Sequence, residues 1–124
     1  MSIHAATTLL AGAALLGVAT AALAQDAANP QKPALAKDDG EKRILETIVE
    51  ARKGQRYANV SDADGRLLRQ LTEAVNAKRV VELGTSTGES GLYFSLALRK
   101  TGGKLYTYDI DPGRVEVAKA NFRK

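Results

Sequence analysis

The sequence has 124 residues, of which 44% are hydrophobic and 26% are charged, and its formal net charge is +4. This length allows one small domain at most. There is no cysteine, which excludes disulfides and thiolate metal sites. The single histidine, His4, lies in an N-terminal leader, so the mature part has neither a histidine base nor a histidine metal ligand. The positive charges are scattered and form no basic run interleaved with aromatic residues, so no nucleic-acid partner is expected.

The first 24 residues differ in composition from the rest of the chain, because they are apolar, rich in alanine and contain no Asp, Glu, Lys or Arg. Ala22 and Ala24 fit the small-x-small rule for signal-peptidase cleavage, which predicts a signal peptide over residues 1–24 and an exported, periplasmic or secreted protein. The alternative is an uncleaved membrane anchor with a cytoplasmic domain, because no Lys or Arg precedes the apolar segment and basic residues follow it. A membrane is therefore expected as a partner only through this segment.

Residues 25–40 contain Pro30, Pro33, several charges and little apolar surface, which is typical of an extended linker. The folded part is expected over residues 41–124, with an α/β fold. Its hydrophobic patterns predict, in chain order, helices over 41–54 and 59–78, a strand over 79–83, a helix over 90–100, a strand over 104–110 and a helix that begins at Pro112.

Local signals support these elements. Ser61 and Asp64 have the spacing of a capping box, and Asp111 is followed by a proline at the first helical position. The second helix is expected to have an apolar face that includes Leu67, Leu71 and Val75.

The segment 79–83 is short and β-branched, as in a parallel strand that is covered on both faces. A strand, a helix and a second strand of these lengths predict parallel strands joined by a right-handed crossover.

The turn after the first strand, "GTSTGESG", combines three glycines with small or polar residues. A helix that follows a strand directly exposes unpaired N–H groups and the positive end of its dipole, so a bare loop there lets a polar or anionic ligand approach the backbone. Gly84 permits the turn, Gly88 permits close approach, and Gly91 lets the helix pack on the sheet. Asp109, at the end of the next strand, is an acceptor for ribose hydroxyls. These features predict a nucleoside-cofactor site, although such turns also occur without a ligand.

The loop spacing bears on which nucleoside cofactor is bound. The fingerprint of NAD-binding proteins is G-x-G-x-x-G, whereas this loop reads G-x-x-x-G-x-x-G, with Ser86 at the place of the second glycine. A pyrophosphate needs close contact with the backbone at that glycine, so the spacing counts against a dinucleotide.

Three segments, "VVELGTSTGESGLYFSLAL", "GGKLYTYDIDP" and "VEVAKANFRK", resemble the class I S-adenosylmethionine-dependent methyltransferases. The chain looks most like the small-molecule O-methyltransferases of the catechol and caffeoyl-CoA type, and the upstream "SDADGRLLRQL" resembles the helix before the first motif of that family. The resemblance covers about residues 58 to 124 and implies the N-terminal part of a Rossmann-like, doubly wound methyltransferase fold with S-adenosylmethionine as cofactor.

The resemblance also implies roles for residues of the two motifs. Glu82 would face the ammonium group of the cofactor, Ser90 would bind its carboxylate, and Asp109 would accept both ribose hydroxyls. Further residues would line the cofactor along the loop or pack on its adenine: Gly84, Thr85, Ser86, Gly88 and Ile110. Asp111 is interpreted as a helix cap.

In the family that the chain resembles, acceptor chemistry, divalent-metal ligands and a catalytic lysine come from later segments, and no motif for them is present here. The chain is therefore interpreted as an incomplete N-terminal fragment of an enzyme that methylates a small molecule, and the fragment alone is expected to be inactive. The catalytic residues are unknown, and a divalent metal is expected only in the missing part. Two alternatives stay open: a non-catalytic cofactor-binding module, completed by oligomerisation as a homodimer, and an NAD(P)-dependent dehydrogenase fragment.

Overall fold

The computed structural model describes residues 35–55 and 57–124. The predicted signal peptide or anchor, and residues 25–34 of the predicted linker, lie outside these residues. Within the described part of the chain, no helix has both the length and the apolar character needed to cross a membrane.

The order of elements is the predicted one: helix, helix, strand, helix, strand, helix. The elements are α2 (Asp39–Ala51), α3 (Asp62–Ala74), β1 (Arg79–Leu83), α4 (Glu89–Thr101), β2 (Lys104–Tyr108) and α5 (Pro112–Phe122). The two strands are parallel, and their register pairs Arg79 with Lys104 and Leu83 with Tyr108. This confirms an α/β fold with a β–α–β crossover.

The first described helix begins earlier than expected. α2 begins at Asp39, so the last two residues assigned to the linker belong to the helix. The reason is the N-cap: the Asp38 carboxylate accepts a hydrogen bond of 2.8 Å from the N–H of Glu41 and so satisfies one of the unpaired donors of the first turn.

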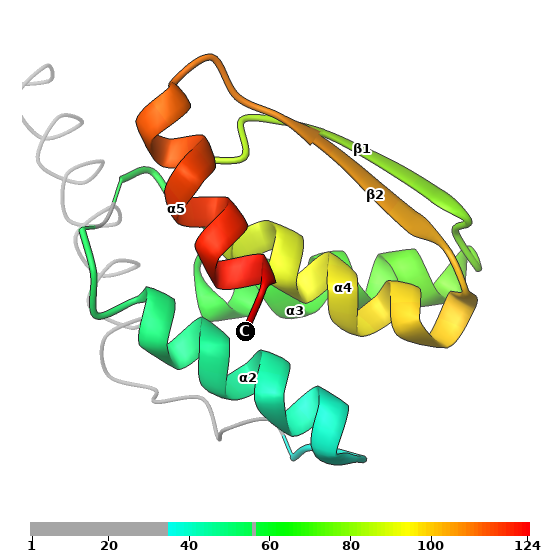
Figure 1. Cartoon of the computed structure of the whole chain (residues 1–124). Coiled ribbons are helices and arrows are strands. Elements are labelled where there is room, and N and C mark those ends of the chain that lie inside the picture. The colour runs from blue at the N-terminus through cyan, green and yellow to red at the C-terminus, as the bar shows by residue number, and fades with distance from the viewer. Residues whose placement is uncertain (1–34, 56) are drawn as a thin grey trace, which may run out of the picture. The chain divides into compact units, whose positions relative to one another are not determined.

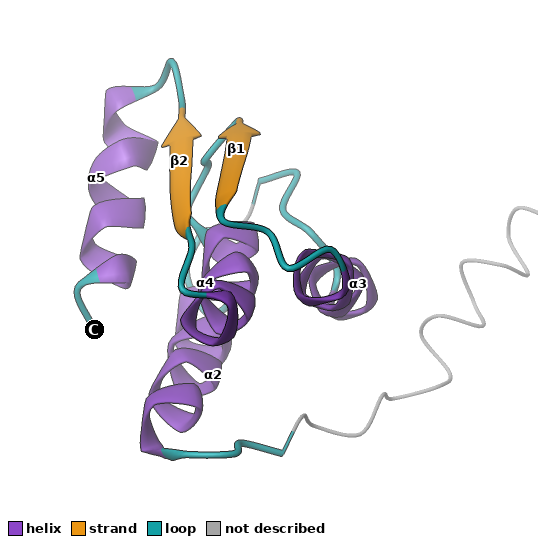
Figure 2. Ribbon diagram, turned by 90° about the vertical axis from the view of Figure 1, so that its right-hand side faces the viewer, coloured by secondary structure: helices purple, strands orange, loops and turns teal. Residues whose placement is uncertain are grey.

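Helix α4 lies at the centre of the described part. It runs beneath the two strands, with α2 on its opposite side, in both views (Figures 1 and 2). Leu92, Tyr93 and Leu96 of this helix form the buried core with Ile48 of α2. Because α4 has neighbours on several sides, it is apolar over most of its circumference, as the sequence "GLYFSLAL" shows.

Small residues let neighbouring elements approach α4 closely. A side chain on Gly91 would meet Phe122 of α5 and Leu105 of β2, which confirms that this glycine permits tight packing on the sheet. A side chain on Gly65 of α3 would overlap the ring of Tyr93. α3 therefore packs on α4 through a face that carries Gly65 and the buried Thr72.

The apolar face expected for the second helix is wrong in part. Leu67, Leu71 and Val75 are exposed in the described structure, although Ser61 caps the helix as predicted and its hydroxyl accepts a hydrogen bond of 3.1 Å from the N–H of Asp64. The stripe of larger side chains lies off the contact with α4 because the small residues, not the large ones, allow the helices to come close.

The expectation that the first strand is covered on both faces is also wrong for the described residues. Side chains along β1 alternate between half-buried and exposed, and Val81 and Leu83 are 67% and 85% exposed. Tyr106 and Tyr108 of β2, the register partners of these two residues, are exposed as well. Only the face that carries Glu82 and Thr107 is covered.

Candidate cofactor site

The predicted loop and the predicted acid lie side by side at the carboxyl ends of the strands. The N–H groups of Gly84 and Thr85 both donate to the carbonyl oxygen of Tyr108, at 2.7 and 3.1 Å, so the loop after β1 stays attached to the last residue of β2. The Ser86 N–H then donates to Oδ2 of Asp109 at 2.7 Å. The structure therefore brings together the two motifs that the sequence separates by more than 20 residues.

Asp109 is held as a fixed anion. Its second carboxylate oxygen, Oδ1, accepts a hydrogen bond of 2.9 Å from the N–H of Asp111. The hydrogen bonds from the N–H groups of Asp111 and Ser86 lower the pKa of Asp109 below its ordinary value, because they stabilise the charged form. Each oxygen keeps a lone pair for a further donor. Ile110, the next residue, has a fully exposed side chain.

The loop backbone contains three positive φ angles, at Gly84 (95°), Ser86 (47°) and Gly88 (89°). Gly84 has open space where a side chain would stand, as expected of a residue that leaves room for a ligand. A side chain on Gly88 would instead meet Phe122 at 3.0 Å and Ala118 at 3.3 Å. The close approach that Gly88 permits in the structure is therefore that of α5.

Glu82 points from β1 into the same region, and hydroxyl groups hold both of its oxygens. Ser90 donates to Oε1, and Thr107 donates to Oε2 at 2.7 Å. The Thr85 hydroxyl lies 2.5 Å from that of Thr107, and since the single Thr107 proton is directed at Glu82, Thr85 must be the donor of this pair. Thr85 is buried, and its hydroxyl orients Thr107 rather than facing outward.

A pocket of about 340 Å³ opens beside these residues. Five of the predicted site residues line it: Glu82, Gly84, Thr85, Ser86 and Ser90. Gly88, Asp109 and Ile110 do not line it, although Asp109 is joined to it through the Ser86 N–H. The remaining wall is mainly apolar and comes from Ala58, Val60, Leu68, Val81, Leu83 and Phe94, with Asn59 and Glu89.

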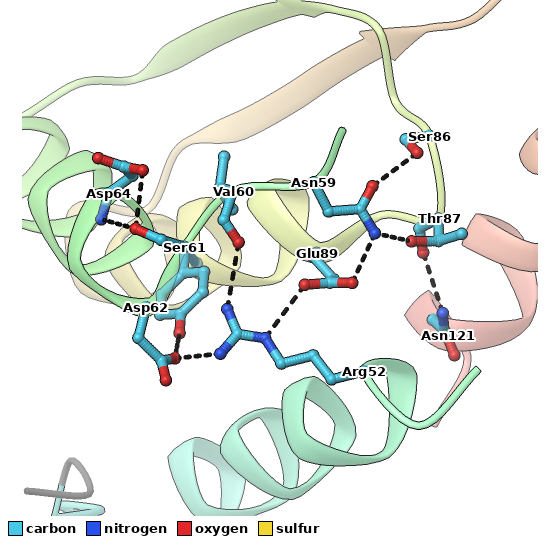
Figure 3. A network of polar contacts seen from close by, with 11 residues as sticks. Arg52, Asn59, Val60, Ser61, Asp62, Asp64, Ser86, Thr87, Glu89 and Asn121 are labelled. Carbon is cyan, nitrogen blue, oxygen red and sulfur yellow. Dashed lines mark hydrogen bonds and ion pairs between the residues drawn. The ribbon is translucent and has the colours of Figure 1, made fainter. Parts of the chain in front are cut away.

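The segment before α3, and Asn59 above all, is not predicted as part of the site from the sequence. Asn59 contacts three residues of the loop and of the start of α4, and Figure 3 shows it at the centre of a polar network that reaches from Arg52 to Asn121. No local signal identifies Asn59, because it has no motif of its own and its partners lie 27 to 30 residues away in the sequence.

Metal ligands are not gathered in this site. Among residues 35–55 and 57–124, no group of three or more histidine, aspartate or glutamate side chains is placed to hold a metal ion. The divalent metal expected in a later part of the protein stays a prediction.

Known proteins resemble this chain in sequence and in structure. The profile of the O-methyltransferase family matches residues 35–124. The catechol O-methyltransferase of Niastella koreensis is 34% identical over 86 residues, which are 69% of this chain and 38% of that protein.

Two solved structures share the fold. The cofactor-bound structure of Rv0187 from MTB has a TM-score of 0.52 and 28% identity, and the match covers 77% of this chain and 46% of that one. The SAH-bound methyltransferase PaMTH1 of Podospora anserina has a TM-score of 0.61 and 17% identity, over 99% of this chain and 47% of that one. At 17% identity this second likeness concerns the fold alone.

This chain spans less than half the length of each of these three proteins. The family profile nevertheless covers most of the chain, including β1, the glycine loop, β2 and the acid that follows it. The dehydrogenase alternative is therefore wrong. The chain belongs to the O-methyltransferase family, of the catechol and caffeoyl-CoA type.

Proposed function

We propose that the protein transfers a methyl group from S-adenosylmethionine to a hydroxyl oxygen of a small molecule, and that the described residues hold the cofactor. The observation that carries this proposal is the hydrogen bond between the Ser86 N–H and Asp109, because it unites the bare loop and the acid in one site. Family membership supports the reaction type, since members of the family are named for O-methyl transfer.

The residues at the ribose end fit such a cofactor. Asp109 is charged, its two oxygens are fixed by backbone N–H groups, and each retains a lone pair for a ribose hydroxyl. Gly84 leaves open space beside it. Charge-assisted hydrogen bonds to a fixed carboxylate are stronger than those between neutral groups, so this acid is well suited to a vicinal diol.

The residues at the amino-acid end fit as well. Glu82 supplies a negative charge that faces the pocket, as an ammonium group requires. Ser90 lies in the first turn of α4, where the helix dipole favours an anion such as a carboxylate. The Ser90 hydroxyl donates to Glu82 in this structure, so binding a ligand carboxylate would require it to turn.

The bound cofactor would supply an electrophilic methyl group on a sulfonium sulfur. The described residues would fix its two ends, Asp109 the ribose and Glu82 with Ser90 the amino acid, so that the methyl group is held in line for attack. We assign none of the described residues to the acceptor or to its deprotonation.

Calorimetry with S-adenosylhomocysteine and the full-length protein tests this function. Asp109→Ala removes a charged acceptor, and we expect binding to weaken by about 1.5–3 kcal/mol. Asp111→Ala is the matched control, because Asp111 caps α5 and its side chain accepts from the N–H of Arg114. We expect the control to lose about 1 kcal/mol of stability and to keep its affinity. Equal affinity of Asp109→Ala and the wild type would show that Asp109 does not contribute to binding of the cofactor.

For the N-terminal segment we propose export, on the sequence of residues 1–24 alone. A fusion of this segment to alkaline phosphatase tests the proposal, because that enzyme gains activity only outside the cytoplasm. We expect an active fusion; an inactive one would favour the membrane anchor with a cytoplasmic domain.

A further inference from the structure

A charged residue is buried at the start of α4, where the cofactor loop ends. Glu89 is 2% exposed, and its carboxylate accepts hydrogen bonds from Arg52 Nε at 3.1 Å and from Asn59 Nδ2 at 2.6 Å (Figure 3). Burying a carboxylate is costly unless it is paired, and such a pair is weak evidence for a gain in stability. Glu89 therefore calls for a role other than stabilising the fold.

Glu89 fixes the orientation of the Asn59 amide. A carboxylate can only accept hydrogen bonds, so the NH₂ group of Asn59 must face it, and the second N–H of that group donates to Thr87 Oγ1 at 2.8 Å. The amide oxygen then faces Ser86, whose hydroxyl donates to it at 2.8 Å. All three contacts of Asn59 are thus determined by the position of the buried acid.

Ser86 is the point at which this orientation reaches the cofactor site. Its backbone has a φ of 47°, a left-handed conformation that non-glycine residues adopt at a cost. Two hydrogen bonds hold it there: the hydroxyl to Asn59 and the N–H to Asp109. If the first bond is lost, the residue can relax and turn its N–H away from the acid.

We propose that Asn59, oriented by the Arg52–Glu89 pair, is a positioning residue that fixes Ser86 and thereby aims Asp109 at the ribose of the cofactor. The part of this proposal that concerns the ribose rests on the proposed function. The part that concerns the hydrogen bonds from Arg52 to Ser86 does not, because it can be tested without a ligand. Arg52 lies just beyond the last residue of α2, so the chain also joins that helix to the cofactor loop.

The ligand-free test is hydrogen exchange of the Ser86 amide, measured by NMR on the full-length protein. Asn59→Ala removes the partner of the Ser86 hydroxyl, and we expect the amide to exchange about three- to tenfold faster. Glu41→Gln is the control, because Glu41 is also buried and pairs with Arg69 at 2.5 Å but contacts no residue of the loop. We expect the control to lower thermal stability and to leave Ser86 unchanged. Unchanged exchange in Asn59→Ala would overturn the proposal.

A second pair of variants separates positioning from simple loss of packing. Asn59→Asp places two carboxylates against each other and should speed exchange at Ser86 as much as Asn59→Ala does. Adding Glu89→Gln restores a donor and an acceptor with the polarity reversed and the net charge of the pair preserved, so protection of Ser86 should return. Failure of the double variant to restore it, in a protein that is still folded, would contradict the assigned orientation.

Binding of S-adenosylhomocysteine then tests the link to Asp109. We expect Asn59→Ala to weaken binding about fivefold to tenfold when Asp109 is present. In a protein that already carries Asp109→Ala, we expect Asn59→Ala to cause no further loss of affinity, because Asn59 acts through Asp109. Equal weakening in both backgrounds would show that Asn59 acts independently and would overturn the proposal. If the wild type does not bind the ligand, the proposed function fails, while the exchange of Ser86 still decides the role of Asn59.

Discussion

Gly84 has a backbone conformation that L-residues rarely adopt, with a φ of 95° and open space where a side chain would stand. We expect Gly84→Ala to lower the free energy of unfolding by about 1–2 kcal/mol through backbone strain. The new methyl group would also enter the pocket, so affinity for S-adenosylhomocysteine should fall. Chemical denaturation and calorimetry measure the two effects.

Gly102 provides the matched control for this substitution. It has a φ of 70° and equally open surroundings, but it caps the far end of α4, away from the pocket. Gly102→Ala should therefore cost a similar free energy of unfolding and leave affinity unchanged. A Gly84→Ala variant that binds as tightly as Gly102→Ala would show that Gly84 is not in contact with the ligand.

The residues that could be predicted from the sequence are those whose signal is local. The glycine loop, Glu82 before it and Asp109 after β2 each follow from the order of strand and turn, and the structure places them together. Asn59 could not be predicted, because its role depends on the buried position of Glu89, 30 residues later. The sequence shows Glu89 only as one more polar residue in the loop.

At the scale of elements, the same limit applies to helix faces. Hydrophobic periodicity predicts the existence of α3 correctly, and the spacing of Ser61 and Asp64 predicts its cap, but neither indicates which face meets α4. The contact is made through a face that carries Gly65, where the ring of Tyr93 comes close, and the buried Thr72, whereas Leu67 and Leu71 stay exposed. Hydrophobic periodicity depends on which residues are apolar, and it therefore does not indicate a contact that depends on small side-chain volume.

The contact between α3 and α4 includes a hydrogen bond that depends on pH. The hydroxyl of buried Tyr93 donates to Asp62 at 2.5 Å, and burial together with this bond raises the pKa of Tyr93 to about 12, from 10.0. Because the folded-state pKa is raised, this contribution to stability is fully present below pH 10 and is lost as the pH rises toward about 12.

Tyr93→Phe tests this contribution. The variant should be less stable than the wild type at neutral pH, because Asp62 loses a donor. Its deficit should shrink as the pH rises from 10 to 12, which denaturation at several pH values would show. A constant deficit across this range would mean that the tyrosine does not titrate as the contact implies.

At the scale of the whole described part, the sheet is covered unevenly. Val80 and Val81 are neighbours in β1, but Val80 is half-buried on the face toward α4 and Val81 is 67% exposed. In this chain we expect Val80→Ala to lower the free energy of unfolding by about 1 kcal/mol and Val81→Ala by less than about 0.5 kcal/mol. The two variants control each other, because the substitution and the strand are the same.

Equal losses for the two valines in this chain would contradict the exposure of Val81. In a longer protein whose further elements pack on the open face, the loss for Val81→Ala should rise toward that for Val80→Ala. Denaturation of both variants, in this chain and in such a longer protein, therefore measures whether the face of the sheet that carries Val81 becomes buried.

The attachment of the loop to the end of β2 has a consequence for how the two strands align. A slip of one residue would turn every side chain of a strand to the wrong face, but a slip of two would preserve the alternation. Such a slip would still move Asp109 about 7 Å away from the Ser86 amide. The hydrogen bonds from the N–H groups of Gly84, Thr85 and Ser86 therefore select one alignment among those that hydrophobicity alone tolerates. A ligand that binds both the loop after β1 and the segment after β2 would stabilise this alignment over the others.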